Sequence, residues 1–361
     1  MSCIKETYME YSIMTTNRCN LNCAYCINSA RRSKEPAKKA DAPKIISHIM
    51  SDARKNGYDP VVITFYGGEP MLETGLLSEV MDGTAGLRPM YNIFTNGTLI
   101  SRENIGLLNK MHMISVSIDG DSRLHDEVRG KGSYRRTLEN FAGVKNDLKA
   151  NVLAFVTITP RSRLKDSVLN LTGEFDNIFW FLENSPEKED LAGFLSNYDK
   201  DLDILLDCWM KGLKDGKVTG LIPFQGLYDM LEHKHVYTGL PCGIGTNFQA
   251  IAIDGSVYSC EDSYHNKLGT VSGGVDMKKS RGDFNFEICV NCEIKNVCAG
   301  RCVIPHLNYD KEKVEFYCEC SKMLVDKYKR VLPEIKQLVA SGIVKESDIL
   351  NRLTRFTDVM P

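Results

Sequence analysis

The chain has 361 residues, a formal net charge of −2, and a composition with 43% hydrophobic and 25% charged residues. This length predicts two or three domains, and the balanced charge gives no sign of a nucleic-acid or membrane partner. The chain contains no apolar run long enough for a membrane span and no signal-peptide pattern at its start. We therefore expect a cytoplasmic protein whose thirteen cysteines stay reduced, which excludes a small secreted disulfide scaffold.

Strand and helix patterns alternate along the first half of the chain. Strands are predicted at 10–16, 61–68, 90–97, 113–120, 152–160 and 177–185, with helices at 42–57, 101–110 and 134–148. This alternation predicts an α/β fold with a parallel sheet, and six βα units in about 190 residues fit a partial (β/α)6 barrel. Glycines follow most of these strands, on the face where α/β barrels carry their chemistry.

The second half of the chain has a different pattern. Residues 186–237 are predicted to be a helical bridging region after a first domain at 1–185. Residues 248–260 are predicted to form a hairpin around Asp254-Gly255. A cysteine-rich domain is expected at 238–321, and 322–361 is expected to hold a terminal helix and a tail; the helical pattern itself runs from residue 321 to residue 341. The basic run at 31–39 is interpreted as a solvated loop, or as a docking patch for an acidic peptide.

The cysteines fall into two groups, and only Cys3 and Cys208 stand apart. The first group is C-x3-C-x2-C at Cys19, Cys23 and Cys26; the second contains Cys242, Cys260, Cys289, Cys292, Cys298, Cys302, Cys318 and Cys320. Three thiolates on one short loop can hold three irons of a [4Fe–4S] cluster and leave the fourth iron open. Zinc is the alternative for both groups.

The first group resembles the signature of the radical SAM superfamily, which has C-x3-C-x2-C with an aromatic residue, here Tyr25, before the third cysteine. The resemblance implies that S-adenosylmethionine (SAM) binds the open iron and is cleaved reductively to a 5′-deoxyadenosyl radical. It also implies an electron donor such as flavodoxin or ferredoxin.

Other strand ends match motifs of the same family. Gly67-Gly68-Glu69-Pro70 resembles its GGEP motif, which implies glycine backbone close to the SAM amino group and Glu69 as the acceptor of a hydrogen bond from it. Asn96 and the S-x-D-G segment of Ser117 and Asp119 also match, and are expected to contact SAM or shape its site. Two alternatives remain open here. Asp119 is alternatively a turn cap. The stretch His125-Asp126-x2-Arg129 resembles one that commonly follows S-x-D-G in this family, and it is alternatively a helix-cap and salt-bridge cluster.

Residues 238–321 resemble the SPASM domain, which implies a radical SAM barrel followed by two auxiliary [4Fe–4S] clusters, three clusters in all. The family pattern assigns Cys242, Cys260 and Cys302 to the nearer cluster. It assigns Cys289, Cys292, Cys298 and either Cys318 or Cys320 to the distal one, and spacing favours Cys320. Phe248 stands where some members carry a further ligand. The nearer cluster is therefore expected to have an open iron; alternatively Cys318 is its fourth ligand, or the site differs from the family pattern.

SPASM enzymes act mostly on peptides or proteins, so the resemblance implies a peptide-modifying oxidoreductase of the peptide-maturase branch. Sulfatase maturation and a non-catalytic iron–sulfur protein are the alternatives. Glu261, directly after Cys260, is a candidate general base, because sulfatase-maturing relatives carry a carboxylate there. The first predicted strand begins about ten residues into the chain, so a separate leader-binding protein, or another surface of this chain, is expected to recognise any leader peptide.

Overall fold

The computed structural model describes residues 8–29, 39–184, 191–234, 237, 239–264, 266–280, 286–350 and 360–361. Cys3 and all but the last residue of the basic run at 31–39 lie outside the described residues. No helix in the described part of the chain is long and apolar enough to span a membrane.

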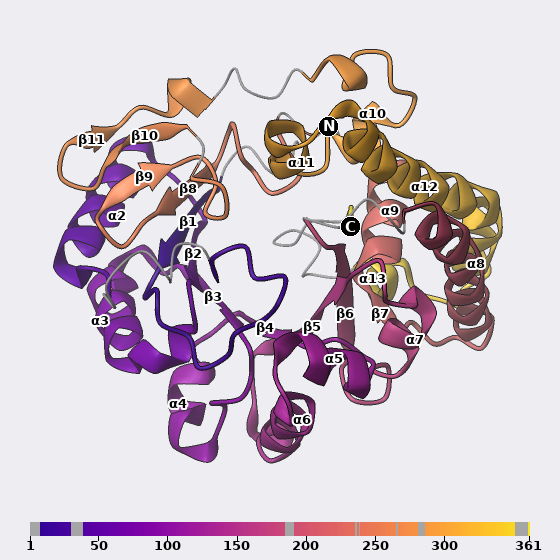
Figure 1. Ribbon diagram of the computed structural model, residues 1–361, viewed down its shortest axis with the longest axis horizontal. Helices are drawn as coiled ribbons and strands as arrows, with labels where there is room; N and C mark the ends of the chain where they lie inside the picture. The colour runs from indigo at the N-terminus through magenta and orange to yellow at the C-terminus, as the bar shows by residue number, and fades with distance from the viewer. Residues whose placement is uncertain are drawn as a thin grey trace.

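One eleven-stranded sheet runs through the molecule in the order β11-β10-β9-β8-β1-β2-β3-β4-β5-β6-β7 (Figure 1). Neighbouring strands from β8 through β1 to β7 are parallel, and β8 to β11 are mutually antiparallel. The strands are β1 (Met9–Met14), β2 (Val61–Tyr66), β3 (Met90–Thr95), β4 (Met113–Ser117), β5 (Asn151–Ile158), β6 (Asn177–Leu182), β7 (Gly220–Leu221), β8 (Phe248–Ile251), β9 (Ser256–Tyr258), β10 (Lys267–Thr270) and β11 (Gly274–Val275).

The helices that connect the parallel strands lie on the outer, convex side of the curved sheet (Figure 1). They are α2 (Ala42–Asn56), α3 (Thr74–Thr84), α4 (Ile105–Leu108), α5 (Ser122–Arg129), α6 (Ser133–Ala142) and α7 (Leu164–Leu169). The later helices are α8 (Leu191–Lys214), α9 (Ile222–Glu232), α10 (Lys295–Cys298), α11 (Val303–Asn308), α12 (Lys311–Ala340) and α13 (Glu346–Ile349). The expected α/β partial barrel with a cysteine-rich C-terminal region is confirmed.

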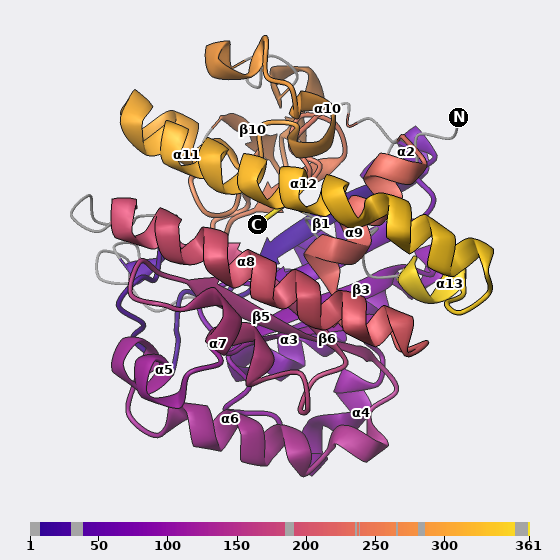
Figure 2. The same cartoon turned by 90° about the vertical axis from the view of Figure 1, so that its right-hand side faces the viewer.

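Helices α8 and α12 lie side by side along one flank of the molecule (Figure 2). The ammonium group of Lys327 on α12 is buried between Asp199 and Asp203 of α8, at N–O distances of 2.9 and 2.7 Å. This double ion pair and the apolar contacts around it stabilise the packing of α12 against α8.

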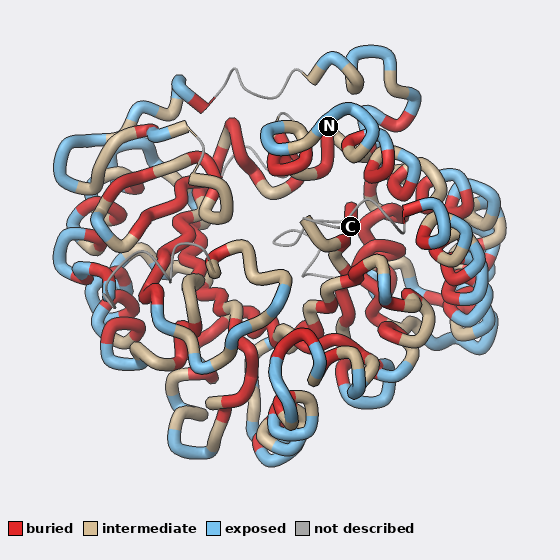
Figure 3. Tube along the Cα trace, in the orientation of Figure 1, coloured by how far each residue is buried: buried red, intermediate tan, exposed pale blue. Residues whose placement is uncertain are grey.

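The two faces of the barrel strands have different chemistry. Met9, Tyr11 and Ile13 of β1 point toward the helices and are fully buried in the main apolar core. The alternate residues Glu10 and Ser12 point to the inner face of the sheet. Figure 3 shows the strands as a mainly buried layer inside exposed helix surfaces. The inner face is therefore enclosed yet partly polar, which is unusual for a layer that only stabilises a fold.

Three features differ from the sequence prediction. A two-residue strand, β7, pairs with β6 inside the region predicted to be helical, and it is too short to produce a pattern. Helix α12 begins at Lys311, ten residues before its predicted start, where Asp310 caps it by accepting a hydrogen bond from the Lys313 amide. The hairpin strand β8 pairs in parallel with β1, so the cysteine-rich region continues the barrel sheet.

Candidate active site

The first cysteine group lies on a loop that follows β1, packed against the two glycines after β2. Gly68 donates a hydrogen bond to the Thr16 carbonyl, and Glu69 donates one to the Arg18 carbonyl, both at 2.8 Å. A Cβ atom on Gly68 would lie only 2.0 Å from the Arg18 main-chain oxygen. The glycines therefore let two backbones touch. The contact between the two backbones explains why glycine is needed at this position. The expected close approach of these glycines to SAM stays a prediction.

We expect Gly68→Ala to destabilise the protein by about 1–3 kcal/mol, because the new methyl group meets backbone that cannot move aside easily. Gly75→Ala is the matched control, since a Cβ on Gly75 meets nothing within 4 Å in helix α3. Urea denaturation followed by circular dichroism measures both variants. Similar midpoints for the two would contradict the role of Gly68 in holding the cysteine loop.

Glu69 joins the ends of β2 and β3 from a fully buried position. Its carboxylate accepts hydrogen bonds from the Thr95 hydroxyl at 2.7 Å, the Asn96 amide at 2.8 Å and the Met71 amide at 3.0 Å. Burial raises the pKa of this carboxyl, and these hydrogen bonds partly offset the rise. The observed bonds give Glu69 a structural role, and its predicted contact with the SAM amino group remains untested.

Asn96 reaches back from the end of β3 to the cysteine loop. Its side-chain amide donates to Asn20 Oδ1 at 2.8 Å and lies 3.9 Å from Cys19 Sγ. The Leu21 amide also donates to Cys19 Sγ, at 3.4 Å. Donors directed at a sulfur favour its thiolate form, which is the form that binds iron. Asn96 is thus placed to support the first cysteine of the loop.

Tyr25, Asp119 and Arg129 form a buried ion-pair network beside the loop. Asp119 accepts hydrogen bonds from the Tyr25 hydroxyl at 2.8 Å, from Arg129 Nε at 2.9 Å, and from the Thr157 amide of β5 at 3.0 Å. Burial acts to raise the pKa of Asp119, but the charge and hydrogen bonds of Arg129 outweigh burial and lower it. Asp119 therefore stays ionised, and it links three elements instead of capping its own turn.

The stretch His125-Asp126-x2-Arg129 has the structural role that was one of its two interpretations. Asp126 accepts hydrogen bonds from the amides of Gly132 and Tyr134 at the start of α6, and Arg129 pairs with Asp119. The Arg129 charge also opposes the effect of burial on Cys23, whose pKa burial raises. Ser117 ends β4 in a half-buried position, and its predicted contact with SAM stays a prediction.

Cys242, Cys260 and Cys302 come together from three separate segments. They belong to one apolar cluster with Phe248, Leu240 and the first residues of α11. Burial, followed by the nearby charges of Asp262, Glu261 and Cys302, raises the pKa of the Cys260 thiol. Phe248 fills part of this cluster with its ring, so the position of the missing family ligand is occupied by an apolar side chain.

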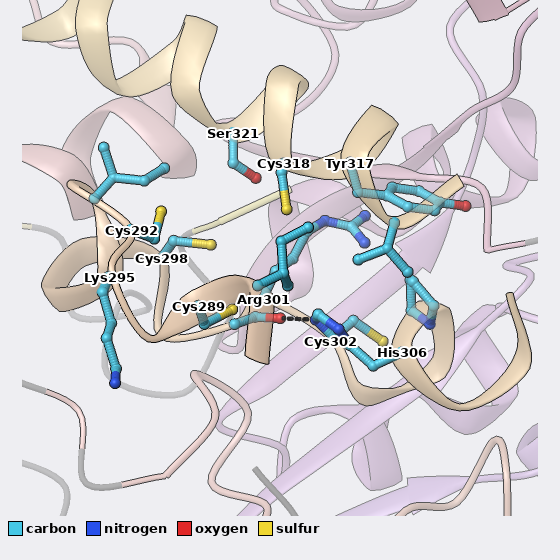
Figure 4. Close-up of a pocket in the computed structure, with 15 residues that line it drawn as sticks. Cys289, Cys292, Lys295, Cys298, Arg301, Cys302, His306, Tyr317, Cys318 and Ser321 are labelled. Carbon is cyan, nitrogen blue, oxygen red and sulfur yellow. Dashed lines mark hydrogen bonds between the residues drawn. The ribbon is translucent and has the colours of Figure 1, made fainter. Parts of the chain in front are cut away.

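Four other cysteines line a second pocket, between α10 and α12. The sulfurs of Cys289, Cys292, Cys298 and Cys318 are directed toward a common space, while Cys302 lies beyond Arg301 at the edge of the pocket (Figure 4). Burial, and then the proximity of Cys298, Cys289 and Cys292, raises the pKa of Cys318 to about 12. The structure therefore places Cys318 with this group and away from the three cysteines around Phe248.

Cys320, which sequence spacing favoured as the distal ligand, lies on another side of α12. Residues two apart on an α-helix point about 200° apart, so Cys318 and Cys320 cannot face the same pocket. Cys320 is 1% exposed and packs in the main apolar core. Cys208 is exposed on α8, as expected for a cysteine outside both groups.

The described cysteines are not arranged as single-metal sites. Among the residues that the structure describes, no group of three or more His, Cys, Asp and Glu side chains is gathered closely enough to hold one metal ion. The group of Cys289, Cys292, Cys298 and Cys318 lines a pocket instead. An iron–sulfur cube separates its thiolate ligands more than a single zinc ion does. This distal pocket has room for a cluster, and the assignment of Cys19, Cys23 and Cys26 as three ligands of the first cluster stays a prediction.

A cavity of about 100 Å³ lies on the inner face of the sheet between the barrel strands and Cys242. Its apolar wall includes Met113, Leu153, Phe155 and Phe179 of β4 to β6, and its polar wall includes Glu10, Thr64 and Asn92 of β1 to β3. Sequence reasoning missed this polar wall. Its signal was present, because each of these three largely apolar strands carries a polar residue on the inward-facing side.

Glu261 also lines this cavity, one residue after Cys260. Burial raises the pKa of Glu261 well above its usual range, and the like charges of Asp262 and Glu10 raise it further. Asp262 in turn accepts a hydrogen bond from the Tyr66 hydroxyl at 2.9 Å. The structure thus brings the candidate base from the hairpin end to the inside of the barrel, next to β1 and β2.

Comparison with known proteins defines the class of this fold and site. Residues 13–161 match the family model described as Radical SAM superfamily. The chain is 26% identical over 332 residues to the "Radical SAM cyclopropyl synthase TigE" of Paramaledivibacter caminithermalis, covering 82% of this chain and 68% of that one. It is 25% identical over 329 residues to a "Cysteine-type anaerobic sulfatase-maturating enzyme" of Clostridium novyi, covering 80% and 85% of the two chains.

Among solved structures, native anSMEcpe with bound AdoMet and Cp18Cys peptide superposes with a TM-score of 0.72 at 18% identity, over 93% of this chain and 99% of that one. This likeness extends beyond the barrel into the cysteine-rich region. The barrel region of the chain therefore matches the radical SAM superfamily, and the chain as a whole has the fold of this solved structure, with a cysteine-rich C-terminal region.

Proposed function

We propose that this protein is a peptide-modifying radical SAM enzyme with three [4Fe–4S] clusters. The observation that carries the proposal is the inner cavity, which the barrel strands share with Cys242 of the nearer cysteine group and with Glu261. A substrate side chain in that cavity would lie between the first cysteine loop and the nearer auxiliary site. Two similar proteins, a cyclopropyl synthase and a sulfatase-maturating enzyme, support chemistry of this class.

Each of the three cysteine groups would hold one cluster. Cys19, Cys23 and Cys26 would hold the first cluster; bound there with SAM, it supplies a 5′-deoxyadenosyl radical that abstracts hydrogen. Cys242, Cys260 and Cys302 would hold the nearer auxiliary cluster, with Phe248 leaving one position without a protein thiolate. Cys289, Cys292, Cys298 and Cys318 would hold the distal one.

The inner polar wall would orient the substrate. Asn92 and Ser115 are at most 1% exposed, and Asn92 Oδ1 and Ser115 Oγ have no hydrogen-bond partner among the described residues. Buried polar atoms without partners are costly, and they are typical of sites that await a ligand. A donor on the substrate would satisfy Asn92, while the aromatic wall excludes water from the reacting carbon.

Protein purified without oxygen is expected to contain about twelve irons and to cleave SAM to methionine and 5′-deoxyadenosine after reduction. Iron assay, absorption spectroscopy and liquid chromatography with mass spectrometry measure these results. A colourless, zinc-loaded preparation would contradict the proposal. We propose flavodoxin or ferredoxin as the natural reductant, which replacing chemical reductant by either protein would test.

Replacing Glu261 by glutamine is expected to lower substrate turnover while SAM cleavage continues without product, because only the removal of a substrate proton is lost. Co-expression with a peptide encoded beside the gene, followed by mass spectrometry, measures turnover. Glu287→Gln serves as a control on the rim of the distal cysteine group. Full turnover in Glu261→Gln would show that the carboxylate is not the base.

A second candidate function, sulfatase maturation, is favoured by Glu261 and Asp262 beside Cys260 on the cavity side of the hairpin. A synthetic peptide with a cysteine in a sulfatase-type sequence tests it. Conversion of that cysteine to formylglycine, seen as a defined loss of mass, would support this candidate, and an unchanged peptide beside active SAM cleavage would eliminate it.

A further inference from the structure

Arg301 is a buried cation with unusual surroundings between Cys298 and Cys302. Its side chain is enclosed, with only 5% of the residue exposed, and its backbone has a left-handed φ of 58°. The guanidinium lies between two aromatic rings, 4.9 Å from Phe181 at the end of β6 and 4.7 Å from Tyr317 on α12. An arginine held in this way costs backbone strain and desolvation, which points to a specific role.

The hydrogen bonds of Arg301 go to main-chain oxygens. Its Nη2 donates to the Leu182 carbonyl at 3.4 Å, and its Nε donates to the main-chain oxygen of Pro361. Its Nη1 is buried and has no hydrogen-bond partner among the described residues. No Asp or Glu side chain forms an ion pair with Arg301 in the part of the chain that the structure describes. The guanidinium therefore has the capacity to bind a further acceptor.

The segment that Arg301 already holds comes from the far end of the sequence. Met360 is 1% exposed and joins the main apolar core, while Pro361 beside it is also buried. Figure 1 places this end of the chain on the inner side of the ring of elements, next to β6. A short peptide segment thus lies at the carboxyl end of a barrel strand, with an apolar side chain buried and its main chain bonded to a cation.

We propose that Arg301 is the main-chain anchor of a peptide-binding site at the end of β6, and that Met360 and Pro361 occupy this site in the free protein. The ligand class is an extended peptide that presents a carbonyl oxygen to Arg301 and an apolar side chain to the core. The substrate peptide of the proposed function would displace the segment of residues 360–361 there. This deepens the proposed function, because it places the substrate backbone relative to the cavity.

Binding of a fluorescein-labelled synthetic peptide of residues 351–361 tests the site by fluorescence anisotropy, with anaerobically prepared full-length protein. A double variant with Met360→Gly and Pro361→Gly is expected to bind this peptide at least about tenfold more tightly than the unmodified chain, since its own segment no longer competes. Adding Arg301→Lys to the double variant is expected to reverse this gain, because lysine keeps the charge but loses the planar set of donors.

A peptide of residues 351–359 is the matched control, and it requires no change in the protein. It is expected to compete at least about tenfold more weakly than the peptide of residues 351–361. Equal binding by both peptides, equal binding by the unmodified chain and the double variant, or no binding at all would overturn the proposal. Anisotropy needs no SAM cleavage, so the proposed function and this site can fail separately.

Discussion

Replacing Cys318 by alanine is expected to remove about four of the roughly twelve irons, while Cys320→Ala is expected to keep them all. The reason is the geometry of α12. Cys318 faces Cys289, Cys292 and Cys298 in the second pocket, whereas Cys320 is buried in the main apolar core. Iron assay and Mössbauer or electron paramagnetic resonance spectroscopy of anaerobically purified protein measure the difference.

The two substitutions form a matched pair on one helix. Cys320→Ala removes a buried sulfur and is expected to cost about 1 kcal/mol of stability, a typical value for a point mutation, with the iron content unchanged. SAM cleavage is expected to continue in both variants because the first cysteine loop is untouched. Loss of iron in Cys320→Ala with retention in Cys318→Ala would reverse the assignment of the distal ligand.

Asp119→Asn is expected to lower the free energy of unfolding by about 3–5 kcal/mol, because it leaves the Arg129 guanidinium buried without its charge partner. The side chains of Arg129 and Asp119 are 6% and 3% exposed, so water cannot replace the lost partner. Asp119 also accepts a hydrogen bond from the hydroxyl of Tyr25, the residue directly before Cys26. We therefore expect the first cluster to be lost at milder urea concentrations than in the unmodified chain.

An exposed ion pair provides the comparison for this experiment. Arg135 and Glu139 lie 3.7 Å apart on α6, with side chains 82% and 68% exposed. Glu139→Gln is expected to change stability by less than about 0.5 kcal/mol. Urea denaturation with iron release as a second readout measures both variants. Equal, small effects would show that the buried network does not support the cysteine loop.

Much of the barrel could be predicted because its signals are local. A few consecutive residues are enough to predict the β-branched strand β2 and the hairpin at Asp254-Gly255, and both predictions are confirmed. The two-residue strand β7 has no such signal, since only its pairing with β6 defines it. The start of α12 was predicted ten residues too late because the segment before it was interpreted as a ligand loop, although cysteines can also stand on a helix.

The sequence by itself determined the class of chemistry. The spacing of Cys19, Cys23 and Cys26 on one loop is a local property, so it predicts three iron ligands without knowledge of the fold. The resemblance implied that Cys242, Cys260 and Cys302 belong together, and only the tertiary structure shows them meeting across segments up to 60 residues apart. Only the tertiary structure placed Cys318 in the distal pocket and Cys320 in the apolar core, because the direction of a side chain on a helix depends on where that helix packs.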